Sequence, residues 1–141
     1  MPSPNSTSCI LLAIHPEFSD KIFDGTKCVE FRRRIPTGAV KHVVVYATAP
    51  VSMVVGWFAV DEIVSLSPQS LWRRFRTVGG INKGRYDEYY AGREIAHAYV
   101  VGELGRMKKP RSLESLGLGS APPQSFQYLS ASVAKRLGIR S

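Results

Sequence analysis

The chain has 141 residues, of which 44% are hydrophobic and 10% aromatic, and this composition indicates one folded domain and excludes a largely disordered protein. Its 19 lysines and arginines outnumber its 11 acidic residues and give a formal net charge of +8, which favours a polyanionic partner but also occurs in basic proteins that bind no nucleic acid. No apolar run approaches the roughly 20 residues of a membrane-spanning helix, and the N-terminus lacks the features of a secretory signal, so we expect a cytoplasmic protein with no membrane partner.

The first elements predicted along the chain are a strand, a helix and a second strand. Residues 9–14 form a continuous apolar run, which predicts a buried strand. Residues 16–24 predict an amphipathic helix, and Gly25 is well placed to end it. Residues 26–33 then alternate as in a second strand.

The middle of the chain predicts two longer strands and a basic helix. Residues 41–48 are rich in β-branched side chains, and residues 51–66 are long enough for a bent strand. Gly56 within the second of these indicates a bulge or a close approach of backbones. Ser67 is a candidate N-cap for a helix over residues 69–77.

The last part of the chain is less regular. Residues 86–90 predict a short helical turn, and residues 94–101 predict a strand that continues to about residue 107. Residues 108–111 are interpreted as a basic connector, and residues 124–137 are expected to be helical, in one piece or in two.

These elements predict an α+β fold class: mainly β, with flanking helices, in which a small curved sheet closes toward a β-barrel. We expect a flexible tail at residues 1–7, which are polar and contain two prolines, and a single domain over residues 8–141.

Cysteine and histidine spacing indicates neither a disulfide framework nor a metal site. Cys9 and Cys28 lack C-x-x-C spacing, and we expect both to be buried thiols in strands. His15, His42 and His97 show no i,i+4 pairing. We therefore expect no cofactor and no bound metal, although a dependence on divalent metal stays open.

The most informative segment is residues 25–34, which combines a strand pattern with several charges. If Val29 faces the core, period-two geometry places Glu30 and Arg32 on the opposite face. Lys27 lies at the mouth of this strand. Charges so close together are costly to bury without a partner, so they form either a solvated ladder or the floor of a polar site.

Lys27 and Glu30 are the first candidates for a functional role, because such a pair can transfer a proton or hold a phosphate; the alternative is a structural ion pair. Arg32 can bind either Glu30 or a phosphate with bidentate geometry. Arg33 and Arg34 are expected at a solvated strand end.

A second group of cations lies between residues 62 and 87, where no acidic residue occurs, and we expect these side chains to bind nucleic-acid phosphates. They are Arg73, Arg74, Arg76, Lys83 and Arg85.

The motif Gly25-x-Lys27-x-x-Glu30-x-Arg32 resembles the signature of the ASCH family, the activating-signal-cointegrator-homology domains. The flanking features that agree with this family are His15-Pro16, the segment 46–50, the glycine-centred segment 54–58 and the segment 122–126.

This resemblance implies a barrel similar to the PUA domain, with a cleft between the barrel and the first helix that receives a base or nucleotide, and therefore RNA or a nucleotide as partner. One branch of the family is similar to an amidohydrolase acting on acetylated cytidine, but Glu30 stands where that branch has its threonine nucleophile, which disfavours this activity. Another branch is similar to a ribonuclease that uses lysine, tyrosine and serine. Lys27 matches the lysine, and Tyr46 and Ser125 match by their places in the flanking motifs.

Three functions stay open at this point: an RNA- or nucleotide-binding domain, a hydrolase, and a regulatory protein-interaction module. In the hydrolase, Lys27 and Glu30 act beside Tyr46 or Ser125. Tyr46 is alternatively a core residue, and Ser125 alternatively caps the helix that follows it.

Overall fold

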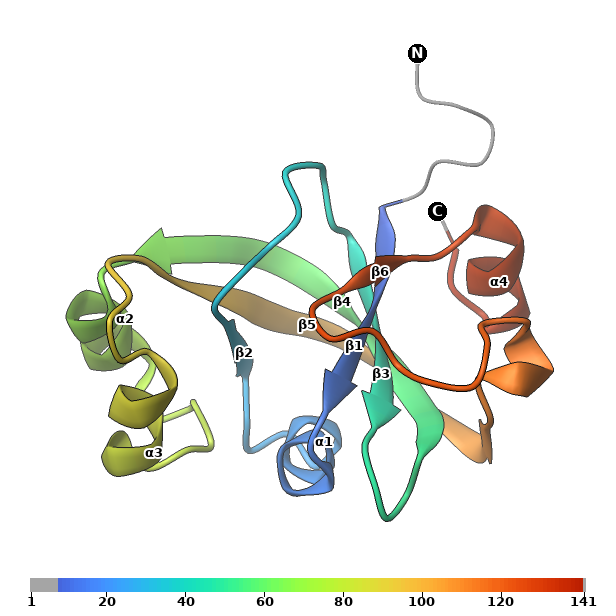
Figure 1. Ribbon diagram of the computed structural model, residues 1–141, viewed down its shortest axis with the longest axis horizontal. Coiled ribbons are helices and arrows are strands. Elements are labelled where there is room, and N and C mark those ends of the chain that lie inside the picture. The colour runs from blue at the N-terminus through green and yellow to red at the C-terminus, as the bar shows by residue number, and fades with distance from the viewer. Residues whose placement is uncertain (1–7, 141) are drawn as a thin grey trace.

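The computed structural model describes residues 8–140, which are organised around a six-stranded sheet (Figure 1). The order of the strands across the sheet is β2-β5-β4-β3-β1-β6. The strands are β1 (Cys9–Ile14), β2 (Val29–Arg32), β3 (His42–Ala47), β4 (Met53–Leu66), β5 (Ala96–Arg111) and β6 (Gln127–Tyr128).

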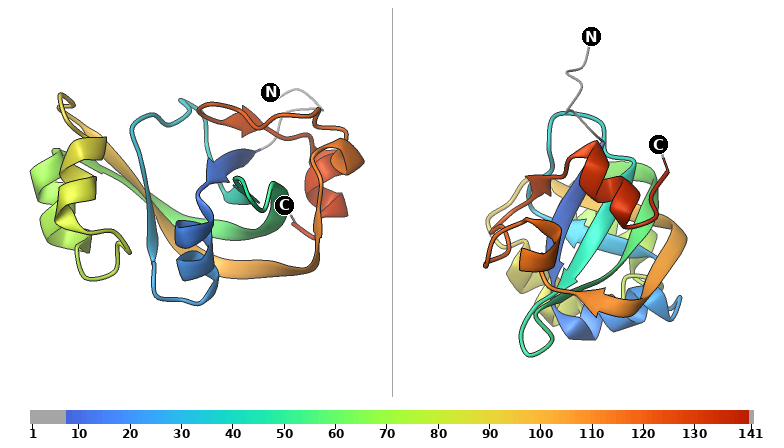
Figure 2. Two further views of the ribbon diagram at one scale, coloured as in Figure 1. Left: turned by 60° about the horizontal axis from the view of Figure 1, so that its bottom comes forward. Right: turned by 90° about the vertical axis from the view of Figure 1, so that its right-hand side faces the viewer.

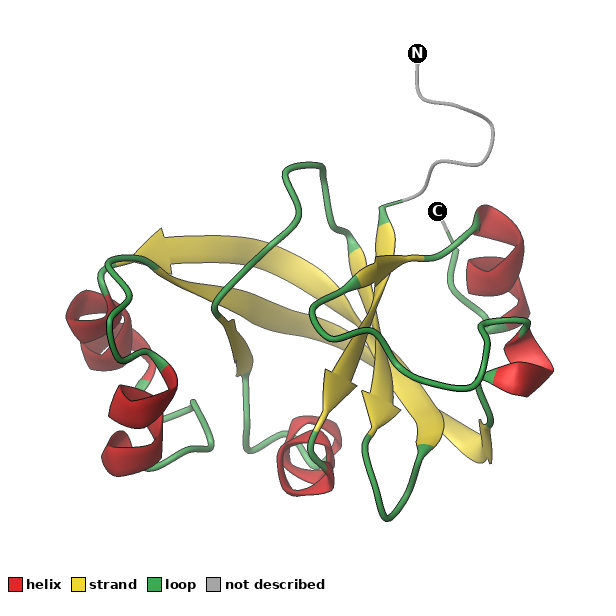
Figure 3. Ribbon diagram, viewed as in Figure 1, coloured by secondary structure: helices red, strands yellow, loops and turns green. Residues whose placement is uncertain are grey.

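Helices lie at both ends of the sheet and beside its middle (Figure 3). Within residues 8–140, no helix is long and apolar enough to cross a membrane. The helices are α1 (Pro16–Phe23), α2 (Pro68–Phe75), α3 (Lys83–Tyr89) and α4 (Ala131–Arg136), and a 3-10 turn, η1, spans Glu114–Leu116.

The sheet curls into a half-barrel, as the end-on view of Figure 2 shows. Strands β1 and β3 are parallel, and the other neighbouring pairs are antiparallel. Register shifts in the pairing of β4 with β5 bend both long strands, because each bulge increases the local twist. The expected fold class, mainly β with flanking helices and a sheet that curls toward a barrel, is confirmed.

Gly56 lies where two backbones and a ring converge. A Cβ built on it would stand 2.6 Å from Cζ of Phe23 in α1 and 2.7 Å from the carbonyl oxygen of Gly105 in β5. Only glycine allows the bent β4 to lie this close to both neighbours, so the close approach expected from the sequence is confirmed.

Strand β1 is buried on both faces, which explains its continuous apolar run. Leu11 packs with Val44 in the core near α4. Leu12 packs with Ile22 of α1 and with Phe58 of β4 in a second core. The first helix is therefore held against the sheet by the strand that precedes it.

A third core attaches α2 and α3 to β2. The ring of Tyr86 in α3 stands 5.0 Å from the ring of Phe31 in β2. The Tyr90 hydroxyl lies 3.0 Å from the carbonyl oxygens of both Arg32 and His97. These contacts set the end of α3 beside the charged strand β2.

Several boundaries differ from those expected. Residues 108–111 are the end of β5 and not a connector: Arg111 pairs with Val54 of β4. Pro110 lies where the pairing shifts from Gly56 with Arg106 to Val54 with Arg111, and a proline is tolerated at such an irregularity of the ladder. The second strand is shorter than expected and begins at Val29, so Cys28 precedes it.

Residues 124–137, expected to be helical, are helical only in their second part. Gln127 pairs with Leu11 of β1, so this part becomes a strand, and α4 begins only after Ser130, whose hydroxyl accepts a hydrogen bond from the backbone N–H of Val133. Helix α3 begins at Lys83, three residues before the expected turn. The N-cap role expected for Ser67 is confirmed. The flexible tail expected at residues 1–7 lies outside the described residues.

Candidate functional site

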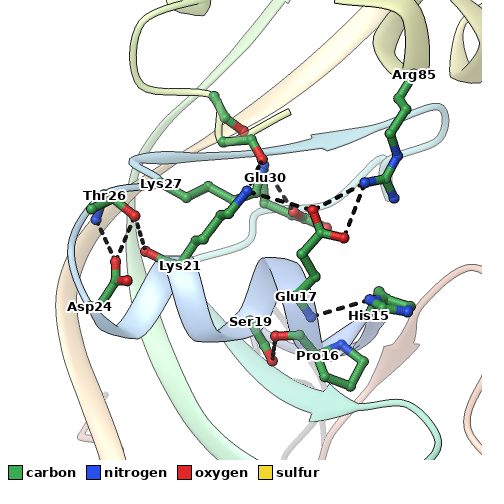
Figure 4. Close-up of polar contacts among 12 residues, drawn as sticks. His15, Pro16, Glu17, Ser19, Lys21, Asp24, Thr26, Lys27, Glu30 and Arg85 are labelled. Carbon is green, nitrogen blue, oxygen red and sulfur yellow. Dashed lines mark hydrogen bonds and ion pairs between the residues drawn. The ribbon is translucent and has the colours of Figure 1, made fainter. Parts of the chain in front are cut away.

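Lys27 follows α1 and is held inside the molecule by its neighbours (Figure 4). The residue is 2% exposed. Its Nζ donates a hydrogen bond to the carbonyl oxygen of Gly79 and lies 3.8 Å from Oε1 of Glu30. Gly79 belongs to the loop between α2 and α3, so one buried ammonium group joins three segments of the chain.

The ammonium group of Lys27 also lies between two aromatic rings. Its Nζ is 5.2 Å from the ring centroid of Phe18 in α1 and 5.0 Å from that of Phe31 in β2. Burial lowers the pKa of Lys27, and the negative charge of Glu30 opposes this by raising it. The protonated form is thus stabilised by a carboxylate, a carbonyl and two ring faces, at the cost of its hydration.

Glu30 and Arg32 project from the same face of β2 and continue this network. Glu30 is 6% exposed, and its Oε2 lies 3.4 Å from Nη1 of Arg32. Arg32 donates hydrogen bonds to the carbonyl oxygen of Ala13 at 3.3 Å and to that of Ser125 at 3.1 Å. Arg32 therefore joins β2 to the end of β1 and to the segment before β6.

These three charged residues line one cavity of about 180 Å³, which we call the Lys27 cavity. Its remaining walls are mostly apolar and aromatic, so the charged groups form the polar part of an otherwise apolar hollow. The side chains that build these walls include His15, Phe18, Phe31, Ile81 and Tyr89.

A second cavity, of about 310 Å³, adjoins the first, because Arg32 and Tyr89 line both. We call it the arginine cavity. Arg33 and Arg34 are exposed, as expected at a strand end, and they also line this cavity, together with Arg93 from the loop before β5. The three consecutive arginines after Phe31 indicate a positively charged site in the sequence, but no sequence pattern places Arg93 beside them.

A set of ion pairs holds α1 against α3 beside the Lys27 cavity (Figure 4). Nη1 of Arg85 lies 3.1 Å from both carboxylate oxygens of Glu17, and Nζ of Lys21 lies 3.6 Å from one of them. The hydrogen bond from Arg85 is the main cause of the lowered pKa of Glu17. The guanidinium group of Arg85 also lies 4.8 Å from the ring centroid of Phe18, which lines the Lys27 cavity.

The five cations expected to bind phosphates lie outside both cavities, although Arg85 contacts Phe18 at the edge of the Lys27 cavity. Within the part of the chain that the structure describes, none of them lines either cavity. All are exposed, and three form ion pairs on the surface. The pairs are Arg74 with Glu62, Lys83 with Asp87 and Arg85 with Glu17, while Arg73 and Arg76 complete the group.

Tyr46 and Ser125, the two other candidate catalytic residues, occupy different places. Tyr46 is 7% exposed and packs in the core near α4 with Leu11, and it is not among the residues that line the two cavities. Ser125 lines the arginine cavity. Its alternative role as a helix cap is wrong, because Ser130 caps α4.

The described residues form no cluster of metal ligands, and the two cysteine thiols differ in exposure. Across residues 8–140, no three histidine, cysteine, aspartate or glutamate side chains gather as a metal site. Burial raises the pKa of the Cys9 thiol to about 12. The Cys28 thiol is partly exposed and lies 3.6 Å from the carbonyl oxygen of Gly25.

Residues 12–105 match the family model of the ASCH domain. An ASCH domain-containing ribonuclease of Zymomonas mobilis is 31% identical over 130 residues, which are 90% of this chain and 88% of that protein. The large ribosomal subunit protein uL22 of Ureaplasma parvum is 32% identical over 125 residues, which are 88% of this chain; the chain spans about two fifths of the length of this relative, 40%.

The fold is similar to the crystal structure of ASCH from Zymomonas mobilis, with a TM-score of 0.85 and 31% identity over 93% of this chain and 94% of that one. Two further structures of that protein carry a substitution of tyrosine by phenylalanine or of serine by alanine, and match with TM-scores of 0.85 and 0.86 at 30% identity. They cover 94% and 95% of this chain, and 97% and 96% of the other chains.

Proposed function

The chain belongs to the ASCH domain family, and on this basis we propose that it binds RNA or a nucleotide, with one nucleobase in the Lys27 cavity. The observation that supports this is the buried Lys27–Glu30–Arg32 network at one wall of an otherwise aromatic and apolar cavity. Such a hollow suits a flat, mostly apolar ligand that carries hydrogen-bonding groups at its edge.

A nucleobase has these properties. Its two faces stack on aromatic rings, and the cavity supplies the rings of Phe18, Phe31 and Tyr89. Its edge presents donors and acceptors, for which Lys27 offers N–H groups and Glu30 offers carboxylate oxygens. Binding by such contacts selects single-stranded RNA, because a base in a duplex is not accessible to them.

Contacts with the sugar-phosphate backbone complete this proposal. Helices α2 and α3 lie at one end of the sheet (Figure 1) and carry exposed cations, including Arg73, while the exposed Arg76 follows α2 directly. These side chains add sequence-independent attraction to phosphates. The affinity for RNA is therefore expected to fall steeply as salt increases.

A second candidate function is cleavage of RNA, favoured by the likeness to the Zymomonas mobilis protein named as a ribonuclease. Burial lowers the pKa of Lys27, so this amine loses its proton more easily than an exposed lysine. Lys27 or Glu30 would then take the proton of the attacking hydroxyl or water, and Ser125 lies at the neighbouring cavity. For Tyr46 to take part, its ring would have to leave the core in which it packs.

The test compares the wild-type protein with Lys27→Met, Phe18→Leu and the exposed control Lys109→Met on β5. A short, labelled single-stranded RNA reports binding by fluorescence anisotropy and cleavage by gel electrophoresis. We expect the two cavity variants to lose at least about tenfold in affinity, and the control to change little.

Circular dichroism checks that each variant is folded. If folded Lys27→Met and Phe18→Leu bind RNA as tightly as the wild type, the Lys27 cavity is not the binding site. RNA fragments that form with the wild type and not with Lys27→Met support cleavage. The absence of any binding to RNA or nucleotides at low salt would instead favour a protein-interaction module.

A further inference from the structure

The arginine cavity concentrates positive charge from two separate parts of the chain. Arg32 ends β2, Arg33 and Arg34 follow it directly, and Arg93 comes from the loop between α3 and β5. The position of this loop is set by Tyr90, whose hydroxyl lies 3.0 Å from the carbonyl oxygen of Arg32. The packing of α3 against β2 thus brings a fourth guanidinium group to three consecutive ones.

Little negative charge balances these groups within the protein. Of the four arginines, Arg32 has an ion pair in the described part of the chain, with Glu30 at 3.4 Å. For Arg33, Arg34 and Arg93, no carboxylate of residues 8–140 lies within ion-pair distance. Like charges around one hollow repel each other, and an anion held among them would relieve that repulsion.

The side chains around the cavity suit a phosphate group in particular. Guanidinium groups bind phosphate oxygens with two parallel hydrogen bonds, which a lysine does not offer. The guanidinium of Arg33 stacks 4.7 Å from the ring centroid of Tyr89, and Arg32 is held by two carbonyl oxygens, so both are partly ordered in advance. Gln124 and Ser125 add neutral hydrogen-bond donors.

The arginine cavity also has a fixed relation to the Lys27 cavity. Arg32 and Tyr89 line both cavities, so a hollow with mostly apolar and aromatic walls lies next to one that is rich in arginine. A nucleotide has this layout, with a flat base joined through a sugar to a charged phosphate.

We propose that the arginine cavity binds the phosphate group of the nucleotide whose base occupies the Lys27 cavity. This inference rests on the proposed function and makes it more specific: the ligand is a nucleotide, free or within RNA, and a nucleoside without phosphate binds weakly. Arg34 and Arg93 are the main phosphate contacts, because no carboxylate of the described residues competes for them and, unlike Arg33, neither lies over the ring of Tyr89.

The test measures, by isothermal titration calorimetry, the binding of the four ribonucleosides and of their 5′- and 3′-monophosphates. The proteins are the wild type, the double variant Arg34→Gln/Arg93→Gln, and a control, Lys108→Gln/Lys109→Gln, which loses two exposed positive charges from β5. Because Arg34 and Arg93 form no side-chain ion pair with another described residue, the double variant is expected to fold, and thermal unfolding checks this.

We expect the wild type to bind at least one monophosphate about tenfold or more tightly than its nucleoside. The double variant should bind that monophosphate no better than the nucleoside, while the charge-matched control keeps the difference. Competition by single-stranded RNA would assign the site to a phosphate within RNA, and its absence would assign it to a free nucleotide. Either result supports a phosphate site.

Two results would overturn the inference and leave RNA binding standing: equal affinity of the wild type for nucleoside and monophosphate, or a double variant that retains the wild-type preference. If the wild type binds neither RNA nor any nucleotide at low salt, the proposed function itself fails. The two failures are therefore distinguishable.

Discussion

Replacing Glu30 by glutamine removes the negative charge that two buried cations share. Glu30 lies 3.8 Å from Lys27 and 3.4 Å from Arg32, and the side chains of Lys27, Glu30 and Arg32 are 2%, 7% and 16% exposed. Removing one partner of a buried pair costs about 3–5 kcal/mol, because the remaining charge is left uncompensated. Arg32 keeps two carbonyl acceptors and glutamine keeps one acceptor oxygen, so we expect about 3 kcal/mol, at the lower end of this range.

The loss in the free energy of unfolding caused by Glu30→Gln should also depend on pH. The Glu30 charge raises the pKa of Lys27 against the larger lowering by burial, so its loss lowers the folded-state pKa of Lys27 further below 10.5, the ordinary value of an exposed lysine. Between this lowered pKa and 10.5 the unfolded chain binds more protons than the folded protein, and stability rises with pH. The Glu30→Gln variant should therefore recover part of its lost stability as the pH is raised toward 10.5, the pKa of an exposed lysine.

Urea unfolding followed by far-UV circular dichroism measures these changes, first at neutral pH and then at alkaline pH. The matched control is Glu62→Gln. Glu62 forms an ion pair with Arg74, and the side chains of Arg74 and Glu62 are 51% and 55% exposed, so this pair should contribute at most about 1 kcal/mol. A total stability of about 5–15 kcal/mol is usual for a domain, so the Glu30 variant should remain folded. If Glu30→Gln costs no more than Glu62→Gln, the charges in the Lys27 cavity are not effectively buried.

Two further predictions concern packing and chemical reactivity. Gly56→Ala should destabilise the fold by about 1–3 kcal/mol, because its Cβ would meet Phe23 and the carbonyl oxygen of Gly105; an unchanged melting temperature would show that β4 yields at this point. In the native protein Cys28 should react with a thiol reagent such as Ellman's reagent, whereas Cys9, which is 2% exposed and has a pKa raised to about 12, should react only after unfolding. Equally fast labelling of both thiols in the native protein would contradict this.

Several features followed from local patterns in the sequence. The continuous apolar run of β1 predicted a buried strand, and Ser67 before Pro68 predicted the start of α2. Period-two alternation placed Glu30 and Arg32 on one face of β2, where the structure brings them together. These features depend on residues a few positions apart, whose relative directions the backbone geometry determines.

The burial of Lys27 could not be predicted in the same way. Lys27 lies before β2, and its ammonium group is positioned by Gly79, which is 52 residues away, and by Phe18 of α1. The sequence indicated a charged group at the mouth of the strand, but its burial and its pKa depend on the loop and helix that pack over it.

Long-range packing also decided the irregular C-terminal part and the extent of the site. Gln127 pairs with β1 although its segment has a helical pattern, because a free strand edge was available to it. Arg93 joins Arg33 and Arg34 only because α3 packs on β2. The local pattern thus specified the elements and the charged motif. Contacts between distant segments determined which other side chains surround that motif, because neither strand register nor packing is encoded within one short stretch.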